Sequence, residues 1–154
     1  MPPEFDPHHP TVRRYASQVV ARAAAVVGLA GVAVIHLLDS IGKFHETPYM
    51  GWLYIGLMLG CILTGAALLA GNFREAWIAA VILPLGAIIG FVLTRTTGLP
   101  QAKGDIGNWT EPLGLAALFT EGVLITVGLY AIAALRPVSV LSRRVWNERR
   151  TLAA

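Results

Sequence analysis

The strongest constraint on the fold is a run of 23 residues, from Leu113 to Leu135, in which Glu121 is the only charged side chain. A helix rising about 1.5 Å per residue makes this run long enough to cross a hydrocarbon core about 30 Å thick. An ionised carboxylate facing lipid inside such a helix is costly. We therefore expect Glu121 to face protein and to have a partner on another helix.

Three further apolar runs complete a predicted all-α fold, a four-helix transmembrane bundle. The expected spans are 19–42, 51–70, 76–94 and 113–135, within a membrane domain over 19–136. The chain is 55% hydrophobic and only 14% charged, which is too apolar for an ordinary soluble domain. We predict a multi-pass protein of the bacterial inner (plasma) membrane, with a disordered polar tail at 1–18 and a basic tail at 137–154.

The basic residues predict the orientation of the bundle, because cytoplasmic loops are enriched in Lys and Arg. One side carries nine of them and the other carries Lys43, Arg95 and Lys103; the nine are Arg13, Arg14, Arg22, Arg74, Arg136, Arg143, Arg144, Arg149 and Arg150. Both termini are therefore predicted to be cytoplasmic, and the connections near 43–50 and 95–112 to face outward. No basic face on a folded domain points to nucleic acid, so the lipid bilayer is the predicted partner.

Polar side chains from three spans and two loops are predicted to meet in the outer half of this bundle. His36 lies about 10 Å below the end of the first helix, and Glu121 about 12 to 15 Å below Thr110, so their depths match. We expect these two side chains to face each other or to share a polar cavity. Ser40 and Lys43 lie on the same helix face as His36 but are interpreted as a hydrated helix end. The candidate ligand-binding residues are His36, Asp39, His45, Glu46, Arg95, Glu111 and Glu121.

A metal ion is one candidate cofactor, with His36, His45, Glu46 and Glu121 as its ligands. Imidazole and carboxylate groups suit zinc, copper, manganese or iron. Positions nine apart lie on opposite faces of a continuous helix, so this site requires the chain to unwind between the two histidines. Haem is a second candidate, bound by His36 alone or at a dimer interface. The residues leave the cofactor open.

Several functions fit this pattern. The first is an accessory or small-ligand or cation-binding membrane subunit. One alternative is a proton- or metal-ion-coupled transporter component, because an intramembrane carboxyl beside a histidine is typical of proton or cation relays. The other alternative is a haem- or metal-binding redox protein. A transporter this small would need a homo-oligomer or a larger membrane complex, and Gly56–Gly60 and Gly86–Gly90 provide small-residue packing faces. Catalysis is not favoured, because the usual hydrolase, metalloprotease and nucleotide motifs are absent from the sequence.

The stretch Thr94-Arg95-Thr96-Thr97-Gly98-Leu99-Pro100, followed by Glu111-Pro112-Leu113-Gly114, carries a resemblance. Together with His36 and His45-Glu46 it resembles a group of small multi-span bacterial membrane proteins of unknown function. They share this loop before a last helix that carries a glutamate. The resemblance covers roughly 35–122 and implies that the outer loops and Glu121 form one site, without supplying a substrate. No motif supports assignment to the DoxX-like four-span proteins.

Overall fold

A computed structural model of the chain describes residues 10–71 and 74–134. The described elements are the helices α1 (Pro10–Glu46), α2 (Pro48–Ala70), α3 (Arg74–Thr96) and α4 (Pro112–Ala134), with a short 3-10 helix η1 (Lys103–Asp105) between the last two. These four α-helices are long and apolar enough to cross a membrane. The predicted all-α fold, a four-helix bundle of membrane-spanning character, is confirmed.

The helix ends differ from the expected spans mainly in α1. This helix begins at Pro10, so residues 10–18, which were expected in a disordered tail, are helical. It also continues to Glu46, which leaves only Thr47 between α1 and α2. Pro48 has no N–H to satisfy at the first position of a helix, so α2 begins at once. The predicted tail at 137–154 lies outside the described residues.

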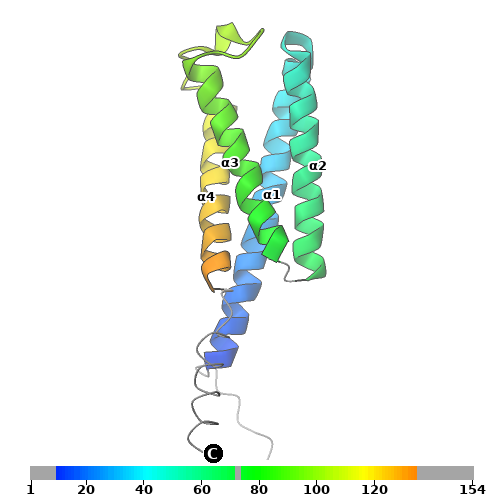
Figure 1. Ribbon diagram of the computed structural model, residues 1–154, viewed down its shortest axis with the longest axis vertical. Helices are drawn as coiled ribbons and strands as arrows, with labels where there is room; N and C mark the ends of the chain where they lie inside the picture. The colour runs from blue at the N-terminus through cyan, green and yellow to red at the C-terminus, as the bar shows by residue number, and fades with distance from the viewer. Residues whose placement is uncertain (1–9, 72–73, 135–154) are drawn as a thin grey trace, which may run out of the picture.

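The helices are packed unequally around the bundle. α1 contacts α2 and α4 extensively, α3 packs mainly on α4, and α1 and α3 barely touch. Figure 1 shows α3 running obliquely, near α2 where α3 begins and diverging from it toward the connection formed by residues 97–111. We call this end of the bundle the long-loop end and the opposite end the Arg74 end. The divergence leaves space between α2 and α3 toward the long-loop end.

One face of α4 fixes how it packs between α1 and α3. Its buried residues recur every three or four positions and include Glu121, Leu124 and Gly128. A Cβ placed on Gly28 of α1 would lie 3.3 Å from Leu124, and one placed on Gly128 would lie 2.6 Å from Val81 of α3. Glycine at these two positions therefore permits close helix contacts. Because Leu124 and Glu121 share this face, the same packing turns Glu121 into the bundle.

The two glycine pairs predicted as packing faces behave differently along their helices. A Cβ on Gly60 would lie 3.0 Å from Leu83, so α2 and α3 meet closely at that level. A Cβ on Gly56, Gly86 or Gly90 would meet no other atom within 4 Å. Within one chain these three glycines border open space, and their use as an oligomer face stays a prediction.

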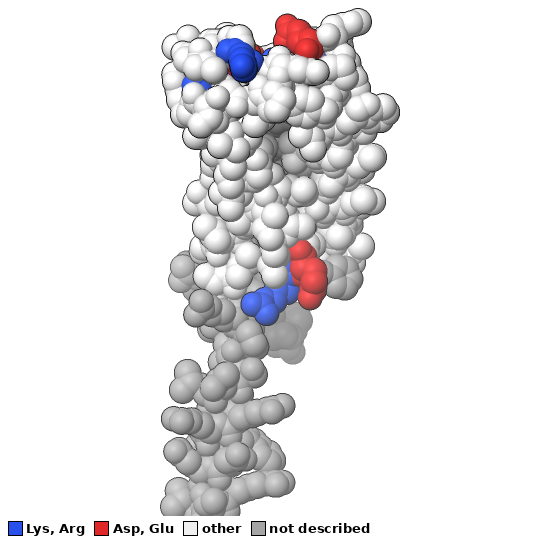
Figure 2. Space-filling view, turned by 45° about the horizontal axis from the view of Figure 1, so that its top comes forward, with Lys and Arg blue, Asp and Glu red and all other residues white. Residues whose placement is uncertain are grey.

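The surface has the distribution expected of a membrane-embedded bundle. Many large apolar side chains are exposed along the helices, among them Leu63 at 70% and Phe119 at 75%. In Figure 2 the charged side chains of the described residues gather at the two ends of a largely uncharged surface. This pattern indicates association with a lipid bilayer. Which end faces the cytoplasm stays a prediction.

The contact at Gly128 predicts a stability difference between two glycine variants of α4. Gly128→Leu forces a side chain against Val81 and should lower stability by about 1–3 kcal/mol. Gly122→Leu is the matched control, because a Cβ there meets nothing within 4 Å. The midpoint of thermal unfolding in detergent, followed by the loss of the monodisperse elution peak, should fall only for Gly128→Leu. Equal midpoints would show that this helix contact is wrong.

Candidate functional site

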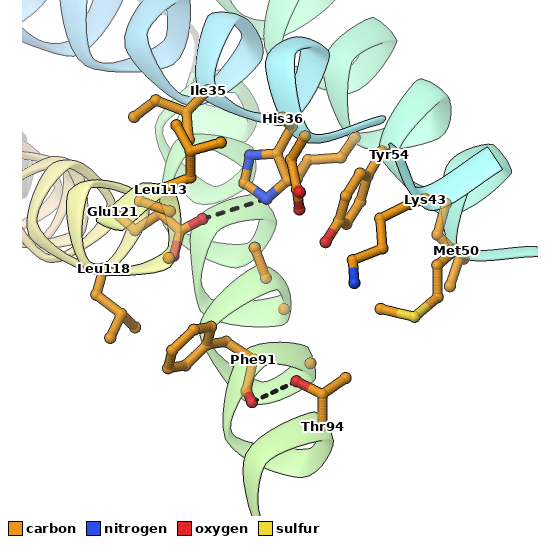
Figure 3. A pocket seen from close by; sticks show the side chains of 18 of the residues that line it. Ile35, His36, Lys43, Met50, Tyr54, Phe91, Thr94, Leu113, Leu118 and Glu121 are labelled. Carbon is orange, nitrogen blue, oxygen red and sulfur yellow. Dashed lines mark hydrogen bonds and ion pairs between the residues drawn. The ribbon is translucent and has the colours of Figure 1, made fainter. Parts of the chain in front are cut away.

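A cavity of about 500 Å³ occupies the half of the bundle nearest the long-loop end. All four α-helices contribute to its lining, as do Leu99 and Asp105 of the long connection. Most lining side chains are apolar, and the polar ones lie at two levels. Figure 3 shows His36 and Glu121 pointing toward each other at one level, with Tyr54 and Lys43 projecting into the space on the other side of His36. We call the deeper level, at His36 and Glu121, the floor of the cavity. We call the level at the long connection the mouth of the cavity.

The floor is formed by His36 of α1 and Glu121 of α4. His36 Nε2 lies 3.7 Å from Glu121 Oε1, and the two side chains are 10% and 2% exposed. The predicted juxtaposition of these residues is therefore confirmed. The separation exceeds the range of a hydrogen bond, and Glu121 Oε1 has no hydrogen-bond partner in the structure. A buried carboxylate oxygen in this position calls for a specific explanation.

The protonation pattern of His36 follows from its other ring nitrogen. His36 Nδ1 lies 2.9 Å from the carbonyl oxygen of Val32, one turn earlier on α1. A carbonyl oxygen can only accept, so Nδ1 carries the hydrogen and donates it. In the neutral ring Nε2 is then an acceptor. The nitrogen that faces Glu121 therefore has no hydrogen to give unless the ring is charged.

Tyr54 and Asp39 form the wall next to His36. The rings of His36 and Tyr54 are 4.9 Å apart between centroids and nearly perpendicular, at 87°, which is a favourable edge-to-face arrangement. The Asp39 carboxylate lies close enough to Tyr54 and to His36 to act on both electrostatically. The Tyr54 ring thus packs against the imidazole from the α2 side.

The mouth is built around Arg95, near the end of α3. Its guanidinium group pairs with Glu111 through Nη2 at 2.9 Å and with Asp105 through Nη1 at 3.3 Å. Lys43 Nζ approaches the same Asp105 carboxylate at 3.1 Å. Arg95 is only 5% exposed and also lies over the Phe91 ring, 4.7 Å from its centroid. These ion pairs join α1, α3 and the long connection across the end of the cavity.

The local sequence of the long connection explains how Asp105 reaches Arg95. Gly98 has φ +71°, a conformation that favours glycine, and its N–H donates to the Leu93 carbonyl at the end of α3. The chain then turns back, so that the N–H of Gly107 donates to the carbonyl of Arg95 at 3.0 Å. The Tyr49 hydroxyl of α2 donates to the Pro100 carbonyl at 2.7 Å. The connection is therefore anchored to both α2 and α3.

The cavity brings together five of the predicted site residues, and two others lie elsewhere. The five that line it are His36, Asp39, Arg95, Glu111 and Glu121. His45 and Glu46 are exposed and do not line it, and Glu46 instead pairs with Lys43 at 3.2 Å. The reason is that α1 stays helical to Glu46, so that the chain does not unwind between His36 and His45.

This arrangement gives no support to the metal site predicted from His36, His45, Glu46 and Glu121. Among the described residues, no group of three or more His, Cys, Asp or Glu side chains is placed to hold a metal ion. Within the same residues His36 is the only histidine that lines the cavity. A haem with two histidine ligands would therefore require a histidine from outside the described part of this chain.

Three residues of the site were not among the sequence candidates. Lys43 shares a helix face with His36 at i+7, but its position at a helix end favoured a hydrated role, whereas it lines the cavity and binds Asp105. Asp105 lies in a loop whose course no periodicity predicts. Tyr54 lies within an apolar span, and only the rotation of α2 in the structure shows that its ring contacts His36.

Comparison with known proteins yields no relative for this chain: no family model, curated protein or solved structure matches it. The resemblance of the 94–100 loop to a group of small bacterial membrane proteins therefore stays a prediction.

The ion pairs at the mouth predict unequal effects of two matched substitutions. Glu111→Gln removes a charge that pairs with the buried Arg95 and should lower stability by about 1–3 kcal/mol. Glu46→Gln is the control, because this carboxylate is 66% exposed and its pairing with Lys43 should contribute about 0–1 kcal/mol. Thermal unfolding midpoints in detergent measure both. A lower unfolding midpoint for Glu46→Gln alone would contradict the ion pairs assigned at the mouth.

Proposed function

We propose that this integral membrane protein binds a small ligand that carries a cationic or hydrogen-bond-donating group, and that this group binds between Glu121 and His36. The apolar cavity would hold the rest of the ligand. This proposal retains the predicted small-ligand or cation-binding role. It gives His36, Asp39 and Glu121 the direct contacts, with Arg95 and Glu111 closing the site.

The observation that carries the proposal is that two hydrogen-bond acceptors face each other without a donor. Glu121 Oε1 is buried and has no hydrogen-bond partner, and 3.7 Å away lies His36 Nε2, which is also an acceptor whenever the ring is neutral. Leaving buried acceptors unsatisfied is costly, by about 1–3 kcal/mol for each group. An ammonium or hydroxyl group of a ligand can donate to both atoms. The floor of the cavity is therefore complementary to a donor.

The charges that line the cavity support a cationic group. Four carboxylates and two basic side chains line it; the carboxylates are Asp39, Asp105, Glu111 and Glu121, and the basic residues are Lys43 and Arg95. Both basic residues already pair with acids at the mouth. Among the described residues, neither Asp39 nor Glu121 forms an ion pair with a Lys or Arg. The Glu121 carboxylate, which has an oxygen without a hydrogen-bond partner, thus remains available to a positive charge.

The size and lining of the cavity also suit a small molecule. Its volume of about 500 Å³ lies within the usual range of ligand pockets, about 300–1,000 Å³. Its walls are mainly apolar side chains from α2 and α3, such as Leu57, Leu83 and Phe91. A few converging polar groups in an apolar enclosure are typical of sites that fix the orientation of a ligand.

Proton or cation transfer is the second candidate, because a proton shared by Glu121 and His36 would also satisfy both acceptors. A complete relay needs polar groups on the way to the Arg74 end. On that side the packed core is apolar, with Leu29, Leu68, Trp77 and Leu124 among its residues. The buried polar groups of the described residues on that side are few and include the Thr64 side chain and the Nε atom of Arg22. The packing therefore favours binding over transfer.

Binding of three probes with the same alkyl chain tests the proposal. Decylammonium, decanol and decanoate are titrated by calorimetry into the protein in nanodiscs, with empty nanodiscs subtracted. The wild type should bind decylammonium most tightly and decanoate least. Glu121→Gln should weaken decylammonium binding about tenfold or more, because a charge-assisted hydrogen bond is lost. Glu75→Gln, at an exposed acid that does not line the cavity, should change the affinity by less than about twofold.

The opposite results identify the alternatives. Equal affinities of Glu121→Gln and the wild type for decylammonium would overturn the proposed binding role. Proton uptake into liposomes that contain the wild type but not Glu121→Gln, measured with an enclosed pH-sensitive dye, would favour the transfer candidate instead. Unchanged thermal midpoints and elution profiles establish that each variant is folded before it is compared.

A further inference from the structure

We infer that the ligand is an amphiphile dissolved in the bilayer and that it enters the cavity sideways, between α2 and α3, through a gap bordered by Gly56, Gly86 and Gly90. We call this gap the glycine window. The inference rests on the proposed function and extends it in two ways. The ligand comes from the lipid, and Gly56, Gly86 and Gly90 border the route by which it reaches the cavity.

The mouth of the cavity does not offer an open route from water. Asp105 of the long connection contacts both Lys43 and Arg95, and Arg95 also binds Glu111. The connection is further attached to α2 by the hydrogen bond from Tyr49 to Pro100. A solute entering at this end would have to separate these contacts.

Two further sides of the cavity are closed by helix packing. Between α1 and α4, a Cβ on Gly31 would lie 3.1 Å from Thr120. Between α3 and α4, the Phe91 ring packs directly on Gly114. Neither contact leaves a passage for a ligand.

The base of the cavity is closed by the contact of Gly60 with Leu83, one turn below Gly56. Above this contact α2 and α3 separate (Figure 1). Gly56, Gly86 and Gly90 line the cavity there, and a Cβ at each would meet nothing within 4 Å. Figure 2 shows a hollow in the uncharged surface below the charged long-loop end. Because α1 and α2 contact each other extensively, the side between α2 and α3 is the one that these contacts leave open.

The borders of the glycine window are apolar and exposed. Leu53 of α2 is 63% exposed and Ile82 of α3 is 59% exposed, and both line the cavity. At this level of a membrane-spanning bundle, such side chains contact acyl chains. A ligand that enters here must therefore be soluble in lipid.

The Glu121 carboxyl group inside the cavity indicates which polar group the ligand carries in addition to its apolar part. The Glu121 side chain is 2% exposed, lines the cavity and has an unpartnered oxygen. An acyl chain alone would leave that oxygen unsatisfied, whereas an amphiphile with a positively charged head satisfies it. The head would bind at Glu121 and the apolar part would lie along the glycine window.

Substitutions that narrow the window test the route. Gly86→Leu and Gly90→Leu place a side chain in the open space, and Gly122→Leu is the matched control, since Gly122 also has free space but does not line the cavity. Asp105→Asn loosens the mouth without touching the window. The probe is brominated octadecylamine delivered in liposomes to the protein in proteoliposomes. Its arrival is followed by quenching of Trp52, which lines the cavity, taken as the difference from Trp52→Phe. Because Trp52 is also 69% exposed, the quenching that persists with excess unbrominated octadecylamine is subtracted as the contribution of probe in the surrounding lipid.

Gly86→Leu or Gly90→Leu should slow or weaken the binding of this probe about tenfold or more, because the added side chain occupies the path and part of the site. Gly122→Leu should remain within about twofold of the wild type. Asp105→Asn, which loosens the mouth, should not accelerate binding. The sideways route is overturned if both window variants bind like the wild type, or if Asp105→Asn alone accelerates binding. In either case a loss of binding in Glu121→Gln would leave the proposed function intact. Wild-type binding by Glu121→Gln as well would overturn both.

Discussion

The burial of the Glu121 carboxyl group is the constraint on which the rest of the structure depends. A carboxylate in the middle of an apolar helix cannot face lipid without a large cost, so this face of α4 has to turn inward. Leu124 and Gly128 lie on the same face and make the contacts that this orientation requires. Burial of the Glu121 carboxyl group and packing of Leu124 and Gly128 therefore require the same rotation of α4 about its axis. That agreement brings Glu121 to His36 without a direct hydrogen bond between them.

The ion pairs at the long-loop end meet a related demand. Arg95 is almost fully buried, and a buried guanidinium needs carboxylates within reach. Glu111 precedes α4 directly and supplies one, but Asp105 reaches it only because Gly98 turns the chain at the end of α3. The loop that carries the Arg-Thr-Thr-Gly-Leu-Pro sequence thus has a structural role. It places a charged cover over a cavity that is otherwise apolar.

The sequence was sufficient to predict the four spans and the partner of Glu121, because both depend on depth in the membrane. Hydropathy fixes the length of each span, and the rise per residue places His36 and Glu121 at the same level. His45 and Glu46 do not line the cavity, and the reason is local. A connection was expected near residues 43–50, but Pro48 is well suited to the first position of a helix, so α1 and α2 are separated by one residue. The cavity could not be predicted either, since it arises from the divergence of α3 from α2 and no residue pattern gives that angle.

Two groups of glycines in α2, α3 and α4 differ in their packing, and the difference bears on why the cavity exists. Gly60, Gly114 and Gly128 are needed for packing, because a Cβ at each would press on a neighbouring side chain. Gly56, Gly86 and Gly90 make no such contact, although glycine inside a helix costs about 1 kcal/mol relative to alanine. Alanine would fit at each of these positions and would strengthen its helix. Glycine there lowers helix stability without improving packing inside this chain, and what it does provide is space beside a buried, unsatisfied carboxylate. A bundle shaped only for stability would fill that space, whereas one that admits a ligand would leave it open.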